Sequence, residues 1–272
     1  DLMVIEEAGQ FALANTLIVA SRAKKTLLLG DPQQLEQVSQ ASHMYPVDKS
    51  ALGHILDKHK TIPDDWGYFL SKTYRMHSKL TKPVSILQYE NRLVSASVTD
   101  ERDLEGVEPG LKKLTLNHSG NTTRSEEEVE EILKLVQQLI GKTWSDKDST
   151  RDLKQQDILI VAPYNNQVRL IKQALIKSDF KKVRVGTVDK FQGQEAPVSI
   201  LSMTTSSGED LPRGIEFLLQ ANRLNVGISR AMWASFIIYS KELLNINPNS
   251  ADAVQRLGAF IGLIQNAQEW DK

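Results

Sequence analysis

The stretch Val185-Gly-Thr-Val-Asp-Lys-Phe-Gln-Gly-Gln-Glu195 decides the fold of this 272-residue chain. The run from Val183 to Val185, with its two β-branched valines, predicts a short strand that ends at Gly186. A polar loop follows, with Gly193 inside it and the carboxylate of Glu195 at its end. Open α/β sheets bind their ligands at loops that follow strands in this way. The stretch therefore predicts a ligand-binding loop in a parallel α/β sheet.

The composition of the chain limits its class. Its 33 Lys and Arg residues nearly balance 34 Asp and Glu residues, which leaves a net charge of −1. The overall charge does not point to nucleic acid, but a local basic groove is compatible with it. The absence of cysteine excludes disulfides and thiolate metal sites and fits a reducing compartment. No apolar run reaches the ~20 residues that span a bilayer.

Alternating strand and helix signals fill the chain. Apolar runs predict strands, with a buried parallel one at Leu2–Ile5 and a central one at Asp157–Ala162; the others are Thr26–Leu29, Lys113–Leu116, Val198–Met203 and Ala234–Ser240, which closes the sheet. Helices are predicted at Phe11–Ser21, Ser50–His59, Leu80–Tyr89, 126–140, 166–177, Ala221–Arg230 and Ala251–Asn266. This order predicts a doubly wound parallel sheet.

Three polar segments and one helix carry more specific predictions. Asp100–Gly110 is predicted to be an acidic loop, Lys142–Gln156 an exposed loop, and Thr204–Gly214 a mobile loop. Ser125 and the three glutamates after it form a capping box that opens the helix at 126–140. The apolar stripe of this helix faces the core, so its acids are predicted to form a solvated face.

Four further motifs occur in a fixed order around the first stretch. They are Ile5-Glu-Glu-Ala-Gly-Gln10, Gly30-Asp-Pro-Gln-Gln-Leu35, Tyr74-Arg-Met-His77 and Asn222-Arg-Leu-Asn-Val-Gly-Ile-Ser-Arg-Ala231. Together the five resemble motifs II to VI of superfamily-one helicases, the first being similar to a Walker B motif. The similarity is greatest to the branch with the nonsense-mediated-decay helicase, the Okazaki-fragment helicase–nucleases and their bacterial relatives. The resemblance implies an ATP-dependent motor with a RecA-like, P-loop NTPase fold.

The resemblance gives catalytic roles to two acids and two arginines. Glu7 would activate water and Glu6 would hold Mg²⁺, where the family usually has Asp before Glu. Arg75 and Arg230 would act as arginine fingers, because a guanidinium pairs with phosphate oxygens and keeps its proton. Plainer alternatives stay open: the acids suit a helix N-terminus and Arg230 a helix C-terminus, while Arg75 would be a surface residue.

Other residues are assigned to the nucleotide by the same resemblance. Gln34 would sense the γ-phosphate, although the preceding Gly-Asp-Pro is also ordinary turn chemistry. Tyr74 would stack on the adenine, and Gly193 would let the backbone approach the nucleotide. Gln192 and Glu195 would lie on the nucleotide side of the loop.

Single-stranded DNA or RNA is the expected partner, with contacts after two strands. The resemblance implies that Thr187 bonds a phosphate and that the turn of Pro163, Tyr164 and Asn165 touches the nucleic-acid backbone. For this turn, plain capping of the helix that follows is an equal alternative.

The same resemblance predicts the domain organisation. Residues 1–60 would finish a first RecA-like domain, and residues 61–272 would form a second one, with ATP bound between them. The chain begins at Asp1 and contains no GxxxxGK[ST] loop. We therefore expect the later part of a longer protein, in which an N-terminal half supplies this Walker A loop. The present chain alone is expected to hydrolyse ATP negligibly.

Two rival functions remain open at this point. One is an ATPase that translocates or remodels without separating strands, and the other is a non-catalytic module that binds nucleic acid or protein. Movement in the 5′-to-3′ direction and a location in the cytoplasm, or in the nucleus of a eukaryote, are expected from the resemblance alone. Some relatives carry a nuclease domain, which would lie outside these residues.

Overall fold

The computed structural model describes all residues except 36–46, 48, 148, 208–213, 249 and 271–272. The chain forms two compact units. Unit 1 contains Asp1–Leu70 and Gln88–Glu90, and unit 2 contains Ser71–Leu87 and Asn91–Lys272. The first unit thus extends ten residues past the expected division at residue 60. The assignment of two RecA-like domains to residues 1–60 and 61–272 stays a prediction.

Unit 1 is built on two short parallel strands. Its elements are β1 (Leu2–Ile5), α1 (Leu13–Ala20), β2 (Lys25–Leu28) and α2 (Ala51–Leu56). The parallel pairing of β1 with β2 is confirmed, but the predicted burial of β1 is wrong for most of it, because Leu2 and Val4 are exposed. Ile5 is the buried residue of this strand in the small core with Ala8 and Leu52, and the partly buried Met3 packs against that core.

Unit 2 contains a six-stranded sheet in the order β10-β9-β11-β12-β6-β13, and every pairing is parallel. The strands are β6 (Gly110–Leu116), β9 (Ile158–Val161), β10 (Arg184–Gly186), β11 (Ala196–Ser202), β12 (Ala231–Ser240) and β13 (Gln268–Glu269). Every residue of β9 and β11 is buried, as expected for strands covered on both faces. The predicted doubly wound parallel sheet is confirmed in unit 2.

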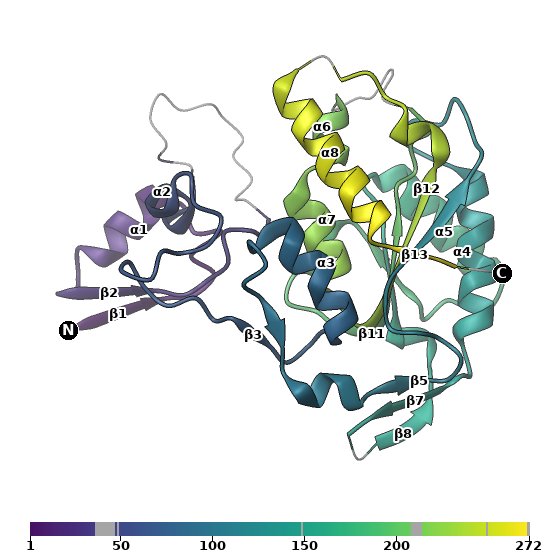
Figure 1. Cartoon of the computed structure of the whole chain (residues 1–272), viewed down its shortest axis with the longest axis horizontal. Helices are drawn as coiled ribbons and strands as arrows, with labels where there is room; N and C mark the ends of the chain where they lie inside the picture. Colours follow the sequence, from purple (N-terminus) through teal and green to yellow (C-terminus); the bar gives the residue numbers. More distant parts are fainter. Residues whose placement is uncertain (36–46, 48, 148, 208–213, 249, 271–272) are drawn as a thin grey trace. The chain divides into compact units, whose positions relative to one another are not determined.

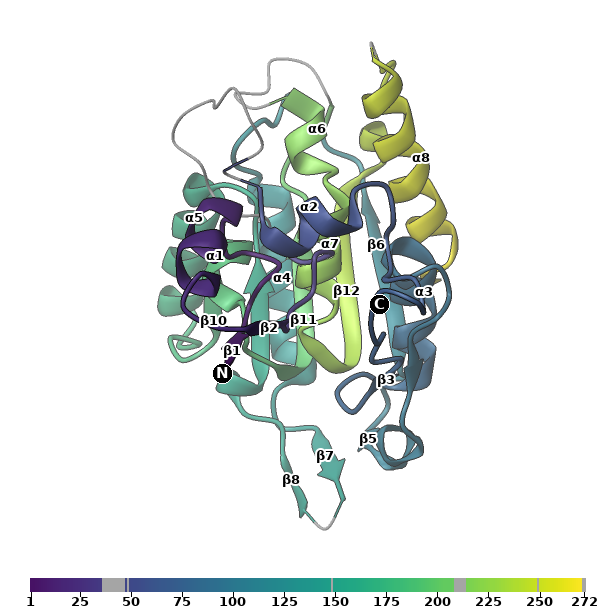
Figure 2. The same ribbon diagram turned by 90° about the vertical axis from the view of Figure 1, so that its left-hand side faces the viewer.

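Helices cover both faces of this sheet (Figures 1 and 2). The helices of unit 2 are α3 (Ser78–Gln88), α4 (Glu126–Leu139), α5 (Asn165–Lys177), α6 (Gly214–Leu218), α7 (Ala221–Ile228) and α8 (Ala251–Gln265), α3 reaching one residue into unit 1. The chain moves towards β10 through α4 and α5, and away from it through α7 and α8. Because parallel crossovers are right-handed, the two pairs lie on opposite faces. Among the described residues, no helix has the length and apolar character needed to cross a membrane.

A second sheet corrects two loop predictions. It contains the strands β5 (Asp103–Leu104), β7 (Thr143–Asp146) and β8 (Ser149–Asp152), which pair antiparallel. A separate two-stranded sheet is formed by β3 (Lys72–Thr73) and β4 (Val94–Ser95), which pair parallel. The segment Lys142–Gln156, predicted to be an exposed loop, is therefore mostly a hairpin, and the segment Asp100–Gly110, predicted to be an acidic loop, contains β5. The polar composition of Lys142–Gln156 hid this hairpin, because Trp144 and Leu153 are the only deeply buried residues among those of the segment that the structure describes.

The edge of the main sheet also differs from expectation. The strand predicted at Ala234–Ser240 is ten residues long and lies inside the sheet, between β11 and β6. The short strand β13 pairs with the far side of β6 and closes this edge instead. Two-residue strands carry too little sequence pattern to be predicted.

Candidate functional site

The segment from Thr187 to Glu195 runs between the two sides of the sheet at which its strands end and begin. We call the side where the parallel strands begin the amino edge and the side where they finish the carboxyl edge. Thr187 follows the carboxyl end of β10, and Glu195 precedes the amino end of β11. Through β9, Gly186 is level with Leu201, which lies five residues along β11 from Ala196. At about 3.3 Å per residue, the two edges are roughly 16 Å apart. The hydroxyl and the carboxylate, only eight residues apart in sequence, thus belong to different sites.

Three of the predicted nucleotide-side residues converge at the amino edge. The Nε of Arg75 lies 2.8 Å from Glu195 Oε2, and its NH1 donates to the Ser229 carbonyl at 3.2 Å. The next residue, Arg230, donates from NH1 to the Gln194 carbonyl at 3.4 Å. Residues distant in sequence therefore form one cluster, which we call the arginine cluster: Arg75, Glu195 and Arg230.

The two arginines of this cluster differ in exposure. Arg75 is partly exposed, whereas Arg230 is 2% exposed and also donates from Nε to the Val226 carbonyl at 3.1 Å. Arg230 thus contacts a carbonyl in the last turn of α7, which fits the helix C-terminal alternative as well as a role toward phosphate. Its burial fixes the guanidinium in place.

The other residues predicted to face the nucleotide lie near this cluster in sequence. Tyr74 is 68% exposed, so its ring is available for stacking. Gln192 is half-buried, and Gly193 is exposed with φ of +72°. That left-handed backbone favours glycine by itself, so the glycine has a local cause in addition to any approach of a ligand.

The residues predicted to contact nucleic acid lie at the carboxyl edge. The turn of Pro163–Asn165 follows β9 and Thr187 follows its neighbour β10, and the Ala162 N–H donates to the Gly186 carbonyl at 3.1 Å. Tyr164 occupies the N-cap position of α5 without a side-chain capping bond, and Asn165 is exposed. The alternative prediction, that the side chains of this turn cap the helix, is therefore wrong.

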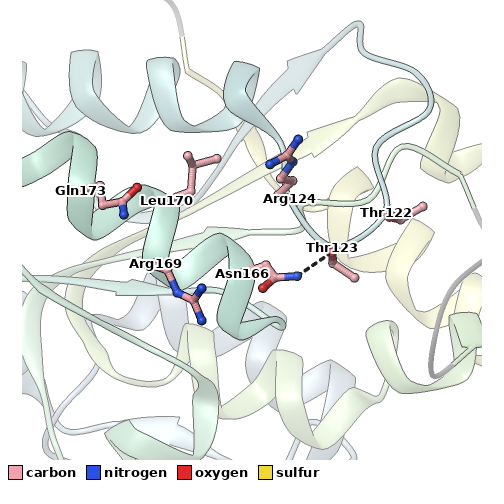
Figure 3. A pocket seen from close by; sticks show the side chains of 7 residues that line it. All are labelled: Thr122, Thr123, Arg124, Asn166, Arg169, Leu170 and Gln173. Carbon is pink, nitrogen blue, oxygen red and sulfur yellow. Dashed lines mark hydrogen bonds between the residues drawn. The ribbon is translucent and has the colours of Figure 1, made fainter.

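A polar pocket opens at the N-terminal half of α5 and was not predicted (Figure 3). Two exposed arginines, Arg124 and Arg169, line it, and the Asn166 amide donates to Thr123 Oγ1 at 3.1 Å. The remaining lining residues are Thr122, Leu170 and Gln173. Two guanidinium groups with amides and hydroxyls around them suit phosphate oxygens. In the sequence, a predicted helix and a predicted strand lie between Arg124 and Arg169. The sequence therefore shows that both residues are charged but does not predict that they line one pocket.

A buried polar network holds the wall of this pocket, and it corrects the prediction that the acids of α4 are solvated. Glu128 is fully buried: both carboxylate oxygens accept from the Thr204 N–H at 2.9 Å, and one lies 3.3 Å from His118 Nε2. The Ser202 hydroxyl also donates to it. Burial raises the pKa of Glu128, and these hydrogen bonds act in the opposite direction. The capping bond from the Glu128 N–H to Ser125 Oγ is confirmed.

The network also fixes the start of the segment predicted to be a mobile loop. Thr204, Thr205 and Ser206 are fully buried, which contradicts mobility there, and residues 208–213 of that segment lie outside the described residues. His118 Nδ1 lies 2.7 Å from Ser206 Oγ, and Thr205 Oγ1 donates to the Thr122 carbonyl at 2.7 Å. The pocket wall is therefore tied to the end of β11.

Unit 1 carries the remaining predicted residues. Glu6 and Glu7 are exposed immediately after β1, and Glu7 has a φ of +52°, a strained value for a residue with a side chain. Gln34 donates to Asp31, whose carboxylate also accepts from Tyr89 at 2.6 Å. Two exposed carboxylates fit Mg²⁺, which takes one or two of them besides phosphate and water. No group of three or more metal-ligating side chains occurs in the part of the chain that the structure describes.

Comparisons with known proteins agree with the helicase-like motifs. A family model described as an AAA domain, AAA_12, matches residues 47–242. The chain is 31% identical over 248 residues to DNA polymerase alpha-associated DNA helicase A of Schizosaccharomyces pombe, covering 85% of this chain and 36% of that protein. It is 28% identical over 267 residues to DNA-binding protein SMUBP-2 of Rattus norvegicus, covering 90% and 25%. With helicase sen1 of S. pombe, identity is 29% over 259 residues, covering 89% and 15%. The chain thus spans about a third of the length of these relatives or less.

Proposed function

The chain belongs to the AAA_12 family of AAA domains, within the superfamily-one helicases, and we propose that it is part of an ATP-driven helicase that acts on single-stranded nucleic acid. The arginine cluster is the observation that carries this proposal. It gathers two guanidinium groups and a carboxylate at one edge of the sheet, while the polar pocket occupies the other edge. In the proposed motor, the arginine cluster serves ATP and the polar pocket serves the nucleic acid.

At the ATP site, we assign the arginine cluster to the phosphates. Arg75 and Arg230 offset negative charge that develops on the transferred phosphoryl group, because fixed guanidinium groups stabilise this charge without reorganising. Glu195 keeps Arg75 oriented until the phosphate takes its place. Glu7 orients the attacking water, Gln34 senses the γ-phosphate, and Tyr74 and Gln192 contact the nucleotide. Glu6 would hold Mg²⁺, which would neutralise phosphate charge.

At the carboxyl edge, we assign uncharged and charged groups to the nucleic-acid backbone. Thr187 and Asn165 offer hydrogen bonds, Arg124 and Arg169 offer charge, and the buried Tyr164 supports the turn between them. The segment from Thr187 to Glu195 joins this edge to the arginine cluster, so that a shift at one end is felt at the other. That connection is how ATP hydrolysis would move a strand, in the 5′-to-3′ direction in this branch.

The test is an assay of the intact protein with single-stranded DNA, single-stranded RNA and duplexes carrying either overhang. We expect ATP hydrolysis that single strands stimulate, and separation of the duplex with a 5′ overhang. Stimulated hydrolysis without strand separation would identify a translocating remodeller. The absence of any nucleic-acid-stimulated hydrolysis would refute the proposed function and favour a binding module.

The substitution Thr187→Val is expected to weaken single-strand binding about 10- to 200-fold. It keeps the branched shape and removes one hydroxyl, and one lost bond to a charged phosphate costs about 1.5–3 kcal/mol. The dependence of affinity on salt should not change, because no cation is removed. Strand affinity of the intact protein is measured by titration at several salt concentrations. Glu195→Gln is the contrast, with a defect in ATP turnover and wild-type strand affinity; equal strand affinity for Thr187→Val and wild type would refute the contact.

Arg124→Gln and Arg169→Gln are each expected to reduce the salt dependence of strand affinity. Each neutralised phosphate contact contributes a slope of about −0.7 to a plot of log K against log salt for single strands. Loss of one arginine should therefore make the slope shallower by roughly 0.7, equally for all base sequences. Lys177→Gln at the last residue of α5 is the matched control, since it removes a cation from the other end of the same helix. An unchanged slope in both arginine variants would exclude the pocket from strand binding.

A further inference from the structure

The buried guanidinium of Arg102 holds the backbone of the Tyr74–Arg75 bend. Its NH1 donates to the Arg75 carbonyl, and its NH2 donates to the Tyr74 carbonyl at 3.3 Å. Its Nε donates to Asp146 Oδ1 at 2.9 Å. All three guanidinium nitrogens thus have acceptors, although Arg102 falls in a segment that the sequence presents only as an acidic loop.

The position of Arg102 follows from the pairing of the second sheet. Asp103 on β5 pairs antiparallel with Ser145 on β7, so the residue before Asp103 lies opposite Asp146. This sheet is anchored, because Leu104 and Trp144 belong to the main core and the Trp144 ring packs edge-on against Trp233 with centroids 6.3 Å apart. Arg102 and Asp146 are therefore attached to a rigid support.

Apart from Arg102, the bend has one local hydrogen bond of this kind among the described contacts, from the Arg75 N–H to Thr73 Oγ1 at 3.2 Å, and it leaves the two carbonyls to Arg102. Before it, Thr73 pairs with Ser95 in the short β3–β4 ladder. After it, the His77 N–H donates to the Met232 carbonyl at 2.8 Å. Between these fixed points, the carbonyls of Tyr74 and Arg75 point to the Arg102 guanidinium, while the Arg75 side chain extends to Glu195 and to the Ser229 carbonyl.

We propose that Arg102, oriented by Asp146, is a positioning residue that sets the Tyr74–Arg75 bend so that Arg75 meets the phosphates of ATP. The inference rests on the proposed function of Arg75. It adds a pair of residues, remote from the nucleotide, through which the second sheet controls the geometry of the arginine cluster. Arg102 suits this task because its planar fork serves several acceptors at fixed angles, whereas a lysine presents one compact ammonium.

The test compares Arg102→Lys and Asp146→Asn with the matched control Arg151→Lys. Arg151 lies on β8 of the same sheet and forms its ion pair with Asp157, and lysine keeps its charge. In the intact protein, we expect Arg102→Lys to lower kcat for ATP about 10- to 100-fold, because a displacement of about 1 Å at a reacting group costs about 10²-fold. Strand affinity and the control should stay at the wild-type level. If Arg102→Lys fails to fold, Asp146→Asn provides the same test, because the Asp146 side chain is partly exposed and its substitution disturbs the core less.

Two further measurements separate this inference from the proposed function. Added to Arg75→Ala, the Arg102→Lys change should slow turnover no further, because residues that act through one another are not additive; an additive loss would overturn the inference. Hydrogen exchange of the amides at residues 74–77 needs no ATP: it should accelerate at least tenfold in Asp146→Asn and stay unchanged in Arg151→Lys. Unchanged exchange in Asp146→Asn would overturn the positioning role. Wild-type turnover in Arg75→Ala would instead refute the proposed function.

Discussion

Substitution of Arg230 by alanine is expected to slow ATP turnover of the intact protein about 10³- to 10⁵-fold, the range found for arginine fingers in phosphoryl transfer. The reason is that a guanidinium acting on transition-state charge contributes little to ground-state binding. Nucleotide affinity should therefore fall by less than tenfold. The measurement compares kcat with the nucleotide Kd for the variant and the wild type.

The burial of Arg230 requires a second variant as control. Its side chain donates to the Val226 and Gln194 carbonyls, so alanine also removes packing and hydrogen bonds at the end of α7. Arg230→Lys keeps the charge and most of the volume but lacks the planar fork, and we expect it to remain folded and to be nearly as slow as Arg230→Ala. Loss of nucleotide binding with kcat intact would move Arg230 to a structural role.

Substitution of Glu128 by alanine is expected to lower the free energy of unfolding by about 3–5 kcal/mol, because each buried donor that is left without its acceptor costs about 1–3 kcal/mol. His118, the Ser202 hydroxyl and the Thr204 N–H would then lose their common acceptor in the interior. Denaturant unfolding followed by tryptophan fluorescence measures the loss, since three of the four tryptophans lie in unit 2.

The control for this variant is Glu130→Ala, which removes an exposed carboxylate from the same helix. It should change stability by less than about 0.5 kcal/mol, as surface substitutions do. Equal stability of the two variants would show that the buried network contributes nothing to the fold. Strand affinity should also fall in Glu128→Ala, because the network holds the Thr122 wall of the pocket.

Because the pKa of Glu128 is raised, its contribution to the free energy of unfolding depends on pH, and the sign of this dependence follows from the shift. Because burial makes the folded state bind the carboxyl proton more tightly than the unfolded state, this contribution is fully present below the ordinary pKa of 4.5. It is lost as the pH rises through the higher folded pKa. Relative to Glu128→Gln, which does not titrate, the wild type should therefore lose stability as the pH rises above 4.5. A wild type that gains stability relative to Glu128→Gln as the pH rises would contradict the direction of the shift.

The sequence by itself determined the parallel sheet and the family. The central strand at Ile158–Val161 is a continuous apolar run flanked by turn signals, and such runs predict strands buried on both faces. The motif around Thr187 and Glu195 is local, so its residues are readable without a fold. For the same reason, the sequence predicted the capping bond from the Glu128 N–H to Ser125, which spans three residues.

Only the tertiary structure decided where these residues meet. Arg75 and Glu195 pair across 120 positions and Glu128 contacts Thr204 across 76, and no periodic pattern carries such distances. Parallel strands start at the same edge, so Thr187 and Glu195 separate although they are neighbours in sequence. The hairpin that holds Arg102 was hidden by its polar residues, because two buried side chains anchor it. Pairing and burial depend on segments remote from one another, and this is why the folded chain was needed to place them.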